Sequence, residues 1–319
     1  MQAMVQKPVI IDTDMANDDW MAILYLLQCP AVEVTGITVA ASGEAHRGPG
    51  VRNALRLLEL AQAPAVPVAG GRKTPLRGKH KFPLIWRLSM DVRLGLSLPR
   101  SKRKPSGQNA VELLTSLIKD ARDKVTIVAL GPLTNLAEAF LADPSLAGKV
   151  GMIYIMGGAV DVPGNLQAPG VKIDNQVAEW NIYVDPYAAA AVFEAGPPVT
   201  LVPLDATNRV PVTMDFYHKC LANHHTPAAD FVFRILKRLK SFIKSGEFYF
   251  WDPLAAVIAV NETIAAFQER HLIVAQAEGA ECGRTLAADG GVPIRVCVSA
   301  DQAQFEKIFL DTLNNLHHG

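Results

Sequence analysis

Four aspartates lie within eight residues near the start of the sequence: Asp12, Asp14, Asp18 and Asp19. Carboxylates a few Å apart repel one another and take up protons unless a cation or strong hydrogen-bond donors compensate their charge. Oxygen ligands at this density suit Ca²⁺ or Mg²⁺ better than zinc, for which histidine and cysteine would be expected. The cluster therefore predicts a divalent cation site. The plainer alternative is an acidic helix start with solvated charges, which the apolar residues 9–11 leading into the cluster make less favourable.

Two later segments offer further polar groups beside aromatic side chains. Glu179, Trp180 and Asn181 are consecutive, and in an extended segment residues 179 and 181 face the same side, where both can reach one polyhydroxylated ligand. Asn165, which follows a glycine, adds another amide. Asp252 follows four aromatic residues, 248–251, and begins an apolar helical pattern. Taken singly, the Glu179 segment is explained equally well by a buried structural network, and Asp252 is explained better as a helix-capping aspartate beside core aromatic residues.

Short apolar runs alternate with helical patterns and predict the elements that position these groups. The expected strands are residues 9–11, 32–39, 124–130, 150–156 and 199–204. Near-continuous apolar strands are typical of a parallel sheet covered on both faces, so we expect an α/β fold: one domain, residues 1–319, with a doubly wound, mostly parallel sheet flanked by helices. Such sheets bind ligands at the carboxyl ends of their strands, where Asp12 and Asp14 fall.

Three local expectations follow from the same patterns. Asn17 is predicted to cap the helix after the aspartate cluster, with Asp18 and Asp19 in its first turn. Residues 227–245 read as one long amphipathic helix, and residues 275–298 as a loop and a β-hairpin before a final helix.

The composition favours a small-molecule partner. The 319 residues carry 31 basic and 31 acidic side chains, so the balanced charge argues against nucleic acid or an anionic membrane surface as the main partner. The four cysteines lie far apart without a CxxC pair, which indicates reduced thiols. No apolar run approaches the roughly 20 residues of a membrane span, and the start of the chain lacks a signal-peptide core. We therefore expect a cytoplasmic protein.

The motifs, taken in order, resemble the inosine-uridine nucleoside hydrolase family over nearly the whole chain. The resemblance is carried by residues 12–19, 131–135, 156–159, 179–186, 205–208 and 251–252. Many members carry a histidine just before the last metal-binding aspartate, whereas this chain has Trp251. The purine-specific inosine-adenosine-guanosine type has tryptophan there, in the Glu-Trp-Asn motif, and in a segment resembling residues 82–87. Trp251, Trp180 and Trp86 match all three positions, so the purine-specific type is the closer match.

The resemblance implies a Ca²⁺-dependent N-ribohydrolase that cleaves the bond between ribose and a purine base in inosine, adenosine or guanosine. Calcium would be held by the side chains of Asp14, Asp19 and Asp252 and by the backbone carbonyl of Leu130. Asp14 would also deprotonate the attacking water, and Asp12 would support the cluster from behind. The ribose hydroxyls would be bound by Asp18, Asn165, Glu179 and Asn181. The resemblance further implies a homodimer or homotetramer.

A purine held between Trp86 and Trp251, beside Trp180, would meet the negative faces of their rings. These faces favour the protonated, cationic base by about 0.5–2 kcal/mol per contact, so the base can leave without a positioned acid. His46 and His80 remain candidate acids. Members of the family usually contact the substrate after the second strand, where this chain offers Ser42, Glu44 and His46, and the choice among them stays open. The basic segments 70–81 and 98–107 are either solvated loops or lids.

Three other functions remain alternatives. One is a nucleoside hydrolase with broader or pyrimidine preference. Another is a Mg²⁺-dependent phosphatase of the haloacid dehalogenase type, which also opens with Asp-x-Asp after a strand, although the pair Asp18 and Asp19 has no role there. The third is a nucleoside-binding protein that has kept the pocket and lost turnover.

Overall fold

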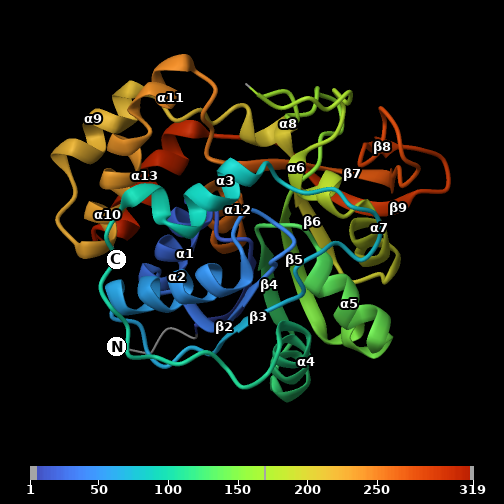
Figure 1. Cartoon of the computed structure of the whole chain (residues 1–319), viewed down its shortest axis with the longest axis horizontal. Helices are drawn as coiled ribbons and strands as arrows, with labels where there is room; N and C mark the ends of the chain where they lie inside the picture. The colour runs from blue at the N-terminus through green and yellow to red at the C-terminus, as the bar shows by residue number, and fades with distance from the viewer. Residues whose placement is uncertain (1–5, 169, 317–319) are drawn as a thin grey trace.

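One central sheet organises the computed structural model, which describes residues 6–168 and 170–316 (Figure 1). Within these residues the sheet has nine strands in the order β3-β2-β1-β4-β5-β6-β9-β7-β8. Neighbouring strands from β3 through β6 to β9 are parallel, whereas β7 is antiparallel to both β8 and β9. The strands are β1 Lys7–Thr13, β2 Val32–Val39, β3 Val68–Gly70, β4 Val125–Ala129, β5 Val150–Met156, β6 Val199–Val202, β7 Ala265–Val274, β8 Thr285–Ala287 and β9 Val292–Ala300. The predicted α/β fold with a mostly parallel sheet is confirmed.

Helices cover both faces of the sheet. On one face α1, α2, α10, α12 and α13 share a core, and on the other α4, α5 and α7 share a second core (Figure 1). Side chains alternate between the two: Val9 and Ile11 of β1 enter the first core and Ile10 enters the second, as the period of a strand requires. The helices are α1 Asn17–Gln28, α2 Arg47–Leu60, α3 Leu84–Asp91, α4 Ala110–Asp120, α5 Thr134–Ala142, α6 Trp180–Val184, α7 Pro186–Glu194, α8 Leu204–Thr207, α9 Met214–Ala222, α10 Pro227–Arg238, α11 Lys240–Ser245, α12 Trp251–Val260 and α13 Gln302–Leu313. No helix in residues 6–168 and 170–316 is long and apolar enough to cross a membrane.

The parallel strands bring distant parts of the chain to one edge of the sheet. The backbone N–H of Leu130, just after β4, donates to the carbonyl of Asp12 in β1. Met156 ends the next strand, β5, and β2 ends beside β1, where Thr13 pairs with Val39. The connections that follow these strands therefore gather over their carboxyl ends.

The C-terminal third differs from the sequence-based expectation. The segment read as one helix over residues 227–245 is two helices, α10 and α11, separated by Leu239, because a second helix that follows directly preserves the amphipathic pattern. Residues 275–298, predicted to be a loop and a β-hairpin, form a loop, the short β8 and most of β9. Strands β8 and β9 are not neighbours in the sheet, because β7, which was not predicted, lies between them. Strand β7 contains the polar run at residues 268–271, much of it exposed, as is common for antiparallel strands with one face toward water.

Candidate active site

A cavity of about 650 Å³ opens at the carboxyl ends of β1, β4 and β5. Its lining combines acidic and amide side chains with aromatic side chains, and we call the aromatic part of the lining its aromatic side. All the predicted site residues except Asp12 contribute to it: Asp14, Asp18, Asp19, Trp86, Leu130, Asn165, Glu179, Trp180, Asn181, Trp251 and Asp252. Residues far apart in the sequence are thus gathered around one volume.

The turn from β1 into α1 fixes the position of Asp19. Its carboxylate accepts the hydroxyl of Thr13, the N–H of Asp14 at 3.1 Å and the N–H of Ala16 at 3.0 Å. Ala16, rather than the predicted Asn17, is the N-cap residue of α1; its side chain makes no capping hydrogen bond, and its backbone N–H donates to the carboxylate of Asp19. Asp18 and Asp19 lie in the first helical turn, as predicted, where the helix dipole favours negative charge.

The backbone at Gly43 and Gly131 lies close to the side chain of Asp14. Its Oδ2 accepts the N–H of Glu44 at 3.0 Å. A Cβ atom at Gly131 would lie 2.7 Å from the Asp14 Cβ, and one at Gly43 would overlap the same side chain. Glycine at both positions therefore leaves the space that Asp14 occupies.

The buried carboxylates destabilise one another's charged forms. Oxygens of Asp18, Asp19 and Asp252 lie within 4.8 Å of one another. Burial, followed by repulsion from neighbouring carboxylates, raises the pKa of Asp18 and of Asp19 to about 7. The same causes raise the pKa of Asp14 and of Asp252 well above the ordinary value. A divalent cation with oxygen ligands would remove this repulsion, so the donor set fits Ca²⁺.

Asp12 lies behind the cavity rather than on its wall. Its Oδ1 accepts the hydroxyl of Thr38 at 2.6 Å and the amide of Asn135 at 2.8 Å. Burial raises the pKa of Asp12 to about 7, against these two hydrogen bonds. Asp12 thereby connects β1 with β2 and α5 directly beneath the aspartate cluster.

The Glu179 segment is helical at its start, which corrects the expectation of an extended segment. Glu179 caps α6, and its carboxylate accepts N–H groups of Gly158 at 3.0 Å, Asn181 at 2.9 Å and Ile182 at 3.1 Å. A helix of five residues is too short for its period to be read from sequence. Because it starts at the cavity wall, Glu179, Trp180 and Asn181 all contribute to the lining.

Two amides connect this helix start to its surroundings. The Oδ1 of Asn165 accepts the N–H of Trp180 at 3.1 Å. The Nδ2 of Asn181 donates to the carbonyls of Leu130 at 3.3 Å and Met156 at 3.2 Å. The carbonyl of Leu130, predicted to bind calcium, therefore faces the same wall as Asn181, with a second lone pair still free to accept.

The aromatic side is built from three helices and the segment before α3. Trp86 in α3 meets Trp180 edge-on, with 5.3 Å between ring centroids, and Phe82 stacks on Trp180 at 4.9 Å. Trp251 begins α12 next to Asp252, and its ring neighbours are Phe248 and Tyr249. The aromatic groups thus adjoin the carboxylates directly.

Several polar atoms around the cavity are buried without partners. The indole N–H groups of Trp180 and Trp251 find no acceptor, and the side-chain oxygens Asn17 Oδ1 and Glu44 Oε2 find no donor, anywhere in residues 6–168 and 170–316. All four residues line the cavity. Because unpaired buried polar groups are costly, this combination favours a ligand with both donors and acceptors, such as a sugar joined to a heterocycle.

Of the residues after β2, Glu44 is the one that lines the cavity. Ser42 is buried against the hydroxyl of Thr134 at 2.8 Å. The ring of His46 bonds Asp91 at 2.7 Å, and that of His80 bonds the carbonyl of Tyr183 at 2.8 Å. Neither histidine belongs to the cavity lining, nor does any residue of the basic segments 70–81 and 98–107.

Sequence reasoning missed part of the lining. Tyr249 and Asn208 carried a signal, because Tyr249 lies in the aromatic run 248–251 and Asn208 lies in the motif at residues 205–208. Gln167, Phe242 and Glu247 carried none. Gln167 lies between β5 and α6, Phe242 lies in α11, and Glu247 lies between α11 and α12.

Comparisons with known proteins agree with this geometry. The model of a family described as inosine-uridine preferring nucleoside hydrolase matches residues 9–307. The chain is 36% identical over 291 residues to uridine nucleosidase 1 of Arabidopsis thaliana, covering 89% of this chain and 82% of that protein. A plant nucleoside hydrolase of known structure is similar with a TM-score of 0.86 at 30% identity, covering 97% and 99% of the two chains. A purine-preferring ribonucleoside hydrolase from Gardnerella vaginalis has a TM-score of 0.82 at 28% identity, with the same coverage. The chain belongs to the inosine-uridine preferring nucleoside hydrolase family.

Proposed function

We propose that this nucleoside hydrolase depends on Ca²⁺ and prefers purine nucleosides, which it cleaves to free base and ribose. The observation that carries the proposal is the junction of two surfaces in one cavity. Buried carboxylates that need a cation line the same cavity as Trp86, Trp180 and Trp251. A ribose at the carboxylates places its base against the tryptophans.

In this proposal the carboxylates have two tasks, which are to bind the cation and to activate the attacking water. Asp14, Asp19, Asp252 and the carbonyl of Leu130 hold Ca²⁺, which neutralises their charge and makes water more acidic when bound. Asp14 orients the attacking water and accepts its proton. Its Oδ2 is held by the N–H of Glu44, and the space left by Gly43 and Gly131 fixes its position. This rigidity supports a role as general base.

The remaining polar residues recognise the sugar. Asp18, Asn165, Glu179 and Asn181 approach from two helix starts and one loop, which suits hydroxyl groups that point in different directions. Positive charge develops on the ribose as the bond to the base breaks, and surrounding carboxylates stabilise it. Glu179 accepts three backbone N–H groups and is therefore already oriented before the sugar binds.

The tryptophans favour departure of the base in its protonated form. Two aromatic faces stabilise a cationic purine by about 0.5–2 kcal/mol per contact. The unpartnered N–H groups of Trp180 and Trp251 can donate to acceptor atoms of the substrate. A purine offers these rings more surface than a pyrimidine does.

Pyrimidine nucleosides are a second candidate substrate class, because the similar protein from Arabidopsis thaliana is named a uridine nucleosidase. A phosphate-free panel of inosine, guanosine, adenosine, uridine and cytidine separates the two. The proposal expects ribose release with higher kcat/KM for the three purines, lost on chelation and restored by calcium. A higher kcat/KM for uridine or cytidine would reject the purine preference but would still support a nucleoside hydrolase. Turnover of p-nitrophenyl phosphate without nucleoside hydrolysis would reject the nucleoside hydrolase activity and favour a phosphatase.

A further inference from the structure

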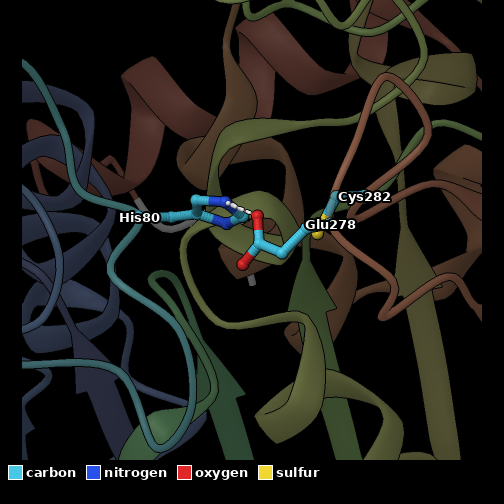
Figure 2. A group of neighbouring side chains, drawn as sticks. All are labelled: His80, Glu278 and Cys282. Carbon is cyan, nitrogen blue, oxygen red and sulfur yellow. Dashed lines mark hydrogen bonds and ion pairs between the residues drawn. The ribbon is translucent and has the colours of Figure 1, made fainter.

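A second group of metal-ligating side chains lies outside the cavity. The side chains of His80, Glu278 and Cys282 point toward one another, and their ligand atoms lie within 4.8 Å of each other (Figure 2). None of the three lines the active-site cavity. The group differs chemically from the aspartate cluster, since it offers one nitrogen, one oxygen and one sulfur.

The backbone around Cys282 holds its thiol in place. The N–H of Cys282 donates to the carbonyl of Gly279 at 3.1 Å, and its carbonyl accepts the amide of buried Asn175 at 2.8 Å. The thiol itself is buried, and it donates over 3.9 Å to the carbonyl of Gln276. A sulfur held this way beside an imidazole and a carboxylate is positioned as a ligand.

Hydrogen bonding also orients the imidazole of His80. Its Nδ1 lies 2.8 Å from the carbonyl of Tyr183, and since a carbonyl only accepts, Nδ1 carries the proton. The other nitrogen, Nε2, faces Oε2 of Glu278 at 3.0 Å. Two lone pairs at this distance repel, so a proton or a metal cation must lie between them. A histidine that binds a metal through one nitrogen typically donates from the other to a carbonyl, as His80 does.

We propose that His80 Nε2, the Glu278 carboxylate and Cys282 Sγ bind a zinc ion. Nitrogen, oxygen and thiolate sulfur are the ligands zinc uses in proteins, and water completes four-fold coordination. Ligands of a tetrahedral zinc with bonds of about 2.0–2.3 Å lie roughly 3.3–3.8 Å apart, so ligand atoms within 4.8 Å of one another need only modest movements to surround the ion. One thiolate and one carboxylate balance the charge of Zn²⁺.

Zinc binding would connect the aromatic side of the cavity to the far end of the sheet. His80 belongs to the segment between β3 and α3, whereas Glu278 and Cys282 lie between β7 and β8. The His80 ring stacks on Tyr183 of α6 at 4.1 Å, and two residues later Phe82 stacks on Trp180. The ion would therefore fasten the segment that leads into Trp86. This role is structural and does not depend on the substrate preference proposed above.

Burial raises the pKa of the Cys282 thiol to about 11, with Glu278 adding to the shift, so zinc must displace its proton to solvent. Metal binding at this site should therefore strengthen as pH rises, as it does for other thiolate ligands.

Cobalt titration tests the site in the intact protein. With calcium in excess to occupy oxygen-only sites, Co²⁺ should produce a near-ultraviolet cobalt–thiolate charge-transfer band that saturates at one equivalent and is displaced by Zn²⁺. Cys282→Ser should abolish the band, whereas Cys220→Ser, at another buried free cysteine, should leave it unchanged. Absence of the band in the wild-type protein, or its survival in Cys282→Ser, would overturn the proposal.

The exposed carboxylate provides a test that does not endanger folding. Glu278→Gln should weaken Co²⁺ binding about 10-fold or more, since loss of even an outer partner of a metal site costs about that much. Glu281→Gln, on the same loop and similarly exposed, should leave the affinity unchanged. Equal Co²⁺ affinities for Glu278→Gln, Glu281→Gln and the wild type would remove Glu278 from the site and overturn the proposal.

Discussion

Removing the divalent cation should make the stability of this protein depend strongly on pH. In the folded chain without metal, the pKa values of Asp18 and Asp19 are raised to about 7 from an ordinary value of 3.8, first by burial and then by repulsion. The folded state therefore holds protons more tightly than the unfolded state. The resulting stabilisation is fully present below the unfolded pKa and is lost as pH rises through about 7.

The size of the change in the free energy of unfolding follows from the difference between the folded and unfolded pKa values. One carboxyl with a pKa raised by about 3 units changes the free energy of unfolding by about 4 kcal/mol in total, at 1.36 kcal/mol per unit. Asp18 and Asp19 repel each other and do not take up protons independently, so we count one carboxyl, which makes about 4 kcal/mol a minimum for the pair. About two of these units lie between pH 5 and pH 7, so chelated protein should lose about 3 kcal/mol from about pH 5 to about pH 8.

Urea unfolding followed by tryptophan fluorescence measures this difference, with chelator or with calcium. Calcium at about 100 times its Kd should add about 2.7 kcal/mol near pH 8, where the carboxylates are ionised, and less near pH 5, where protons compete. Asp252→Asn should abolish the calcium effect and reduce the pH dependence, whereas Asp289→Asn, in an exposed turn, should change neither. Equal stability of the chelated wild type at the two pH values would refute the argument that burial and repulsion raise these pKa values.

Three substitutions probe the parts of the site separately. Asp14→Asn should lower kcat for inosine by about 10²–10⁴-fold, the contribution of a general base, with the fold verified by circular dichroism. Trp251→Leu should lower kcat/KM for inosine about 10-fold through lost cation–π stabilisation and lower that for uridine less; equal losses would contradict stacking on the base. Glu179→Gln must turn its amide nitrogen toward at least one of three N–H donors, so its free energy of unfolding in urea should fall by about 1–3 kcal/mol. Unchanged stability would mean that those hydrogen bonds contribute little.

The parallel part of the sheet could be predicted from the sequence because its strands are buried on both faces. Residues 32–39 and 150–156 match β2 and β5 end to end. Strand β7 could not be predicted, since the largely exposed polar run at residues 268–271 interrupts its apolar residues. Strand β3 has three residues, too few for a pattern. Local apolar patterning therefore predicts strands that are buried in the core on both faces. It misses strands that are very short or largely exposed.

The same distinction holds for the candidate site. The aspartates at the end of β1 were visible as a cluster, and their position at a strand end followed from the fold. That Asp252 lies beside them was implied by the resemblance alone, because nothing local to α12 indicates its packing against α1. The helical start at Glu179 was misread, since a side chain that accepts three N–H groups creates a short helix that sequence periodicity does not reveal.

The packing of α1 against α12 has a consequence for how this chain is made. Asp19 is synthesised early and Asp252 late, so the ribosome exposes an incomplete set of cation ligands for most of translation. The proposed calcium site can then stabilise only chains extended beyond α12. Nascent or prematurely terminated chains that lack this helix would keep the aspartates near β1 without the cation that neutralises their charge. Such chains would be less stable than the complete chain and would be more readily degraded by cellular proteases.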